Sequence, residues 1–135
     1  MSDHIQDEII EQFQGLEWLE KYELLISFAR ELEPMHEQFM TEEYAISGCQ
    51  SKVWIRTHIE NGKLIIHLDS EAMITKGIIY LLMKVMNNRS PQEIVDLDLY
   101  FIEETGLKSN LSPARADGLA SIIKRIREVA EMEIN

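Results

Sequence analysis

A change of hydrophobic period near the middle of this 135-residue sequence constrains its fold most strongly. Between Val53 and Ile59, β-branched residues alternate with polar or bulkier ones, which is the period of a strand. Asn61-Gly62 follows, a dipeptide typical of a two-residue hairpin turn, and residues 64–68 resume the alternation. Elsewhere, apolar residues recur at spacings of three and four. The pattern therefore predicts one antiparallel hairpin set between helical segments.

Two helices are predicted before the hairpin, over residues 3–14 and 17–33. Pro34 ends the second helix, because a proline disfavours helical backbone at the residue that precedes it. The polar segment 34–43 is expected to be irregular, and residues 44–46 to form a short strand that joins the hairpin.

After the hairpin, Asp69 or Ser70 is expected to cap a helix over residues 71–87, since both side chains can accept hydrogen bonds from a first helical turn. Ser90-Pro91-Gln92-Glu93 has the form of a capping box and predicts a short helix to about residue 96. Residues 98–105 form another short helix in this interpretation, and Ser112-Pro113 opens the last one. The fold class predicted is α+β, a small antiparallel sheet of about three strands packed against N-terminal and C-terminal helices, in a single domain over residues 1–135.

Composition excludes several classes of function. The chain has 24 acidic and 13 basic residues, a formal net charge of −11, so its field opposes nucleic acid and no nucleic-acid partner is expected. Its longest strongly apolar stretch, residues 77–83, is far shorter than the roughly 20 residues that span a bilayer. The acidic N-terminal segment lacks the pattern of a signal peptide. We therefore expect a cytoplasmic protein with no membrane contact.

The single cysteine, Cys49, restricts the chemistry further. One cysteine cannot form an internal disulfide, a dithiol redox centre or a four-cysteine metal site, and it favours a reducing compartment. Cys49 lies between Gly48 and Gln50-Ser51, in a polar connection just before the first strand. A free cysteine is most often a small buried hydrophobe, but the flexible glycine and the hydrogen-bonding neighbours equally favour a functional thiol. Nucleophilic use would need a group that lowers the thiol pKa.

Four motifs in order make the interpretation more specific. They are WLEKY at 18–22, GCQSKVWI at 48–55, DSEAMITKG at 69–77 and LSPARADGL at 111–119. In these motifs the chain resembles the SufE family, the accessory proteins of cysteine desulfurases in iron–sulfur cluster assembly. The resemblance covers roughly residues 10–130. Residues 33–43 and Asp117 depart from the pattern of the family, which affects the choice of partner more than the role of the cysteine.

The resemblance implies a sulfur carrier and desulfurase activator rather than an enzyme. Cys49 accepts persulfide sulfur from a cysteine desulfurase of the SufS type, stimulates that desulfurase, and passes the sulfur to an iron–sulfur scaffold complex of the SufBCD type. The carrier holds no pyridoxal phosphate, and no other cofactor or metal is implied. A single thiol suits this role, because a second thiol nearby would release the sulfur as sulfide. A related branch of the family serves a different desulfurase, and that branch remains an alternative.

The same resemblance places Arg115 and Asp69 near the cysteine loop. The guanidinium of Arg115 could stabilise a thiolate or persulfide anion, or bind loop carbonyls, and a surface salt bridge is the alternative. A cation is unfavourable at a helix N-terminus, so its position there calls for a reason. Asp69 is expected to hold the loop, to cap the helix, or both, and direct proton transfer is the less favoured alternative. Gln50 and Ser51 could bond a sulfur anion or only the loop itself.

Two further functions are compatible with the residues alone. An iron–sulfur or metal-binding scaffold would need ligands from a second subunit or from histidines and carboxylates, because the chain has one cysteine. A thiol-dependent enzyme would need a base beside Cys49, and none of the four histidines lies in the four motifs. The sulfur carrier is therefore the preferred hypothesis.

Overall fold

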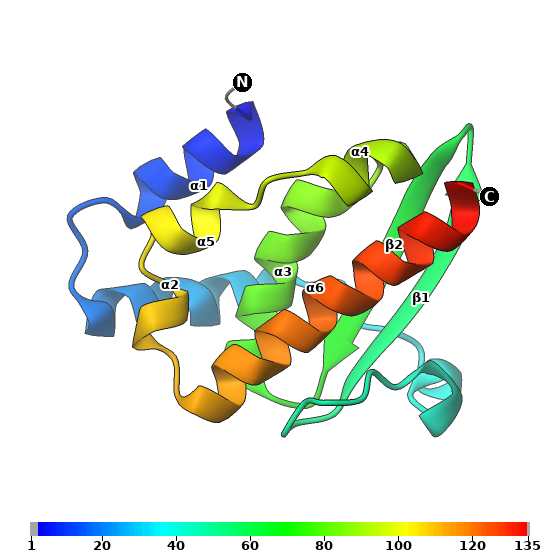
Figure 1. The fold of residues 1–135 in the computed structure, drawn as a ribbon. Coiled ribbons are helices and arrows are strands. Elements are labelled where there is room, and N and C mark those ends of the chain that lie inside the picture. The colour runs from blue at the N-terminus through cyan, green and yellow to red at the C-terminus, as the bar shows by residue number, and fades with distance from the viewer. Residues whose placement is uncertain (1–2, 135) are drawn as a thin grey trace.

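A computed structural model describes residues 3–134 of the chain. Its helices and strands follow the predicted order of two helices, a hairpin and further helices (Figure 1). The α-helices are α1 (His4–Phe13), α2 (Trp18–Glu31), α3 (Met73–Met86), α4 (Pro91–Asp96), α5 (Tyr100–Glu104) and α6 (Pro113–Ile134). The strands are β1 (Val53–Glu60) and β2 (Lys63–Ser70), and the short 3₁₀ helices are η1 (Glu37–Phe39), η2 (Glu42–Tyr44) and η3 (Lys108–Asn110).

The predicted hairpin is confirmed. β1 and β2 pair antiparallel from Val53 opposite Ser70 to Glu60 opposite Lys63. The two residues between the strands, Asn61 and Gly62, both have positive φ, 52° and 76°. This backbone gives a tight turn whose twist matches the strands. The alternation along β2 places Leu64, Ile66 and Leu68 on one buried face.

The sheet of the described residues has two strands, so the expectation of about three is wrong. Ala45 forms only an isolated bridge with Trp54, and the N–H of Ile46 donates to the carbonyl of Val53 at 2.9 Å. The segment cannot extend this pairing, because η2 ends just before it and the chain turns away at Gly48, where φ is +89°.

The predicted cap of the third helix is also wrong. α3 begins at Met73 with Ala72 as its N-cap, while Asp69 and Ser70 remain in β2. Pairing with β1 continues as far as Ser70, which commits both residues to the strand. By contrast, the capping box that begins α4 at Ser90 is present as predicted.

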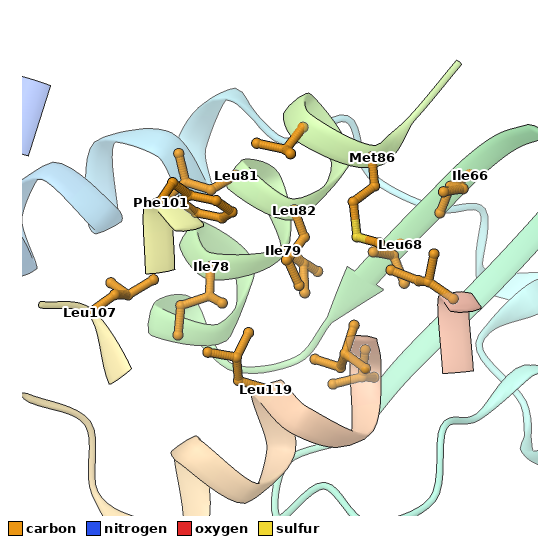
Figure 2. Close-up of a cluster of buried hydrophobic side chains, with 14 of the residues drawn as sticks. Ile66, Leu68, Ile78, Ile79, Leu81, Leu82, Met86, Phe101, Leu107 and Leu119 are labelled. Carbon is orange, nitrogen blue, oxygen red and sulfur yellow. The ribbon is translucent and has the colours of Figure 1, made fainter. Parts of the chain in front are cut away.

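The core lies between the hairpin and the helices. α3 packs on β2 and against α2, and α6 packs beside α4. Figure 1 shows the hairpin at one side of the molecule with the helices gathered beside it. Figure 2 shows buried side chains converging from four elements, namely Ile66 and Leu68 of β2, Ile78, Ile79, Leu81, Leu82 and Met86 of α3, Phe101 of α5 and Leu119 of α6. No helix within residues 3–134 is both long and apolar enough to cross a membrane.

Candidate functional site

The cysteine lies in a short loop between the bridge at Ala45 and the start of β1. The loop, residues 47–51, contains no helix or strand. Its exit is tied to the hairpin, because the N–H of Lys52 donates to the Glu71 carboxylate at 3.2 Å and the carbonyl of Lys52 accepts from Ser70 Oγ at 2.7 Å. The entrance is held by the bond between Ile46 and Val53 already described. Cys49 is thus carried on a short segment with both ends fixed.

Cys49 is half-buried against α6. Its Sγ donates to the carbonyl oxygen of Gly118 at 3.7 Å, a weak hydrogen bond. Burial raises the pKa of the Cys49 thiol above its ordinary value. The resting structure therefore holds Cys49 as a neutral thiol at pH 7, and it does not show the activated thiolate that a free nucleophile would require.

A small cavity of about 80 Å³ adjoins Cys49. Gln50 and Ser51 of the loop line it, together with Thr75 of α3 and Arg115 of α6. The remaining walls are mainly apolar and come from β1, α3 and α6. Because a pocket needs only about 10–15 Å³ of such volume to hold one water, this cavity has room for a further atom beside the thiol.

Arg115 reaches the cavity from the first turn of α6. Its Nη1 donates to the hydroxyl of Tyr22 at 2.8 Å, and the ring of Tyr22 packs edge-on against Trp18 at 4.8 Å between centroids. Within residues 3–134 its guanidinium makes no hydrogen bond to a carbonyl of the cysteine loop. The contact with α2 supplies the reason for a cation at this helix N-terminus, and it fixes the orientation of the Arg115 side chain, a residue that lines the cavity.

Asp69 lies outside that cavity and holds a different segment. Asp69 as a residue is 2 % exposed, and its carboxylate accepts from the N–H of Met35 at 2.9 Å and from the N–H of Ser70 at 2.8 Å. Asp69 therefore fixes the chain between α2 and η1, before the loop begins. Within residues 3–134 its carboxylate makes no hydrogen bond to the cysteine loop.

The structure brings together Cys49, Gln50, Ser51 and Arg115 of the predicted site residues, with Gly48 beside them. It adds Tyr22, which binds Arg115, and Gly118, whose carbonyl accepts from the thiol. Gly118 could have been found from its spacing of three residues from Arg115, which places both on one helix face. The partner of Tyr22, 93 residues away, leaves no local signal.

The described residues contain no cluster of side chains that would form a metal site. Within residues 3–134, no group of three or more histidine, cysteine, aspartate or glutamate side chains is placed to hold a metal ion. Of the histidines flanking the hairpin, His58 lies 3.3 Å from Glu60 and His67 lies 3.2 Å from the carbonyl of Glu33.

Known proteins provide an independent comparison. The family model "SufE: Fe-S metabolism associated domain" matches residues 7–130. An uncharacterized SufE-like protein from Synechocystis sp. is 38% identical over 123 residues, covering 90% of this chain and 77% of the relative. The solution structure of a hypothetical protein from Thermus thermophilus superposes with a TM-score of 0.79 at 20% identity, over 99% of this chain and 98% of that one. This last similarity concerns the fold alone.

Proposed function

This chain belongs to the SufE family, whose members are associated with iron–sulfur metabolism, and we propose that it acts there as a sulfur-acceptor protein. Cys49 takes sulfur from the persulfide of a SufS-type cysteine desulfurase and passes it to a SufBCD-type scaffold complex. The observation that carries the proposal is the placement of the only thiol of the chain beside a small cavity lined by Arg115.

The transfer is a thiol exchange with no net redox change. Cys49 Sγ attacks the terminal sulfur of the partner persulfide, a new S–S bond forms, and the old S–S bond breaks. The partner cysteine leaves as a thiolate and takes the proton released from Cys49. Because burial raises the pKa of Cys49, the free carrier reacts slowly, and docking must lower the cost of ionisation before attack.

The cavity suits the product of this reaction. The persulfide has one sulfur atom more than the thiol, and the space next to Cys49 has room to receive it. The guanidinium of Arg115 can stabilise the negative charge of a persulfide anion there, while Tyr22 keeps the side chain oriented. Once its persulfide sulfur has moved to Cys49, the desulfurase has a free cysteine again and can begin another turnover. The carrier therefore stimulates the desulfurase by accepting sulfur and needs no other catalytic group.

Intact-mass measurement after incubation with a SufS-type desulfurase and cysteine tests the proposal. We expect the protein to gain one sulfur atom, the gain to be lost on treatment with dithiothreitol, and the desulfurase to turn over faster. Cys49→Ser, which is nearly isosteric, should show neither effect. The proposal fails if the wild-type protein gains no sulfur and leaves desulfurase turnover unchanged.

Arg115 can be tested with a graded pair of variants. Arg115→Gln removes the charge and should lower the sulfur-loaded fraction most. Tyr22→Phe removes only the hydroxyl that accepts from Nη1, so its effect should be smaller. Equal loading of wild type and Arg115→Gln, in folded proteins, would remove Arg115 from the proposed site.

A further inference from the structure

We infer that Ser121 of α6 is a positioning residue that holds the cysteine loop closed and thereby limits the reactivity of Cys49. The inference deepens the proposed function, because it concerns how the same thiol is guarded before transfer. It begins from the way the loop is attached to the rest of the protein.

The loop has few attachments between its fixed ends. Within residues 3–134, the five residues 47–51 make two hydrogen bonds to other segments, and both go to α6. One is the weak bond from the Cys49 thiol to Gly118. In the other, Ser121 Oγ donates to the carbonyl of Gly48 at 3.4 Å. This bond is long for a hydroxyl donor, but it is the one that attaches the loop backbone, rather than the thiol itself, to α6.

The hydroxyl of Ser121 forms its hydrogen bond with the cysteine loop rather than within its own helix. Serine inside a helix commonly bonds the carbonyl four residues earlier, and Ser27 of α2 shows such local bonding, to the carbonyl of Leu24 at 2.9 Å. Ser121 instead bonds a residue 73 positions away in the sequence. It lies three residues after Gly118, so the two contacts with the loop share one face of α6.

The close packing of Gly48 against Ser121 also indicates that Ser121 positions the loop. A Cβ added to Gly48 would collide with Ser121 Oγ and lie 3.2 Å from its Cβ. Gly48 also has φ +89°, where other residues are strained. The backbone of the loop thus approaches α6 closely at the residue before Cys49, and Ser121 is the side chain it meets.

Holding the loop at Gly48 keeps Cys49 in the environment that raises its pKa. If Ser121 no longer holds Gly48, the loop leaves α6 more often and the thiol spends more time in water, where ionisation is easier. The rate of reaction of Cys49 with a small electrophile should then rise, and its apparent pKa should fall toward the ordinary value. Loss of one net hydrogen bond corresponds to about a two- to tenfold effect.

The test is alkylation of the free protein by iodoacetamide across a range of pH, followed by mass spectrometry. Ser121→Ala should raise the rate at pH 7 by about two- to tenfold and shift the pH profile to lower pH. Ser27→Ala, which removes an exposed helical hydroxyl bonded within its own helix, is the matched control and should behave as wild type. Thermal unfolding should confirm that both variants fold.

Gly48→Ala supplies a second test, because the added methyl pushes the loop from α6 by collision. It should also raise the alkylation rate, and adding Ser121→Ala, which removes the hydroxyl that the methyl meets, should not raise the rate further. Unchanged rates and pH profiles in both Ser121→Ala and Gly48→Ala would overturn the inference. No desulfurase is present in these measurements, so a failure of sulfur loading on Cys49 would overturn only the proposed function.

Discussion

Two helical glycines, one in α3 and one in α6, meet their neighbours in opposite ways. A Cβ on Gly77 would collide with the carbonyl oxygen of Leu25 and lie 2.8 Å from its carbonyl carbon, so α2 and α3 approach backbone to backbone. A Cβ on Gly118 would lie 3.8 Å from Cys49 Sγ, an ordinary contact distance. The first glycine is required by the packing of the fold, and the second is not.

The difference separates a tightly packed frame from a seat for the thiol that leaves room for a methyl group at Gly118. The frame consists of α2, α3 and the hairpin, and the seat is the face of α6 under the cysteine loop. Glycine inside a helix costs about 1 kcal/mol relative to alanine, and at Gly118 no close neighbour in the resting structure explains that cost. Space beside a thiol that gains a sulfur atom would explain it.

The largest effect is expected from Gly77→Ala. The added methyl meets backbone atoms that cannot rotate away, so α2 and α3 must separate. We expect a loss of about 3 kcal/mol in the free energy of unfolding, at the upper end of the range for overpacked cores. Urea denaturation measures this loss of unfolding free energy, with Gly118→Ala as the matched control. A loss under about 1 kcal/mol would break the distinction between frame and seat.

Asp69→Ala should have the second largest effect, because it leaves the N–H of Met35 buried without its acceptor. A loss of about 2 kcal/mol in unfolding free energy is expected. Asp69→Asn retains an acceptor oxygen and should lose less. Denaturant midpoints of the two variants give the comparison, and equal losses would show that the hydrogen bond to Met35 is not what stabilises this part of the frame.

Gly118→Ala should change stability by no more than about 1 kcal/mol, in the stabilising direction, because alanine favours the helix. The same methyl occupies space beside Sγ, so the sulfur-loaded fraction after incubation with desulfurase should fall. Urea denaturation tests the predicted change in stability, and intact mass tests the predicted fall in the sulfur-loaded fraction. Full loading in a stabilised variant would show that the space beside Cys49 is not used by sulfur.

Acid should produce the smallest effect, and it should act outside both regions, at the N-terminus of α1, where Asp3 is the N-cap. Burial opposes ionisation of Asp3, but hydrogen bonds from Gln6 and the guanidinium of Arg89 at 2.6 Å outweigh it and hold its pKa below the usual range. Asp3 thus contributes stability that is present above its unfolded pKa of about 3.9 and is lost as pH falls through the lower folded pKa.

The measurement is the urea midpoint at neutral and acid pH. Asp3→Asn should lose about 1 kcal/mol or less at pH 7 and show a smaller further loss on acidification than wild type. Asp117→Asn, which alters an exposed carboxylate of α6, serves as the control. An identical acid dependence in Asp3→Asn and wild type would contradict the role given to Asp3.

The sequence predicted the parts of this molecule that depend on local signals. Asn61-Gly62 identified the hairpin turn and Ser90 the start of α4, because turn and cap chemistry lies within a few residues. Ser70 shows the limit of such signals: its residue type favours a cap, but pairing with Val53 keeps it in the strand. The motif containing Cys49 located the loop, and its neighbours in sequence line the cavity.

Contacts between distant segments could not be predicted in the same way. The bonds from Met35 to Asp69, from Arg115 to Tyr22 and from Ser121 to Gly48 join segments separated by 34, 93 and 73 residues. Such pairs form only when the packing of whole helices brings them together, and no local pattern encodes them. The raised pKa of Cys49 arises from burial and belongs to the same class.

The fixed ends of the cysteine loop also set the reach of the thiol. Ile46 is bonded to Val53, and Lys52 to Ser70 and Glu71, so the free span comprises only residues 47–51. At about 3.6 Å per residue, a tether of this length lets its midpoint travel on the order of 10 Å at most. Any partner that exchanges sulfur with Cys49 must therefore bring its reacting sulfur atom to the surface around this loop. The short loop does not allow Cys49 to reach into a deep site on the partner.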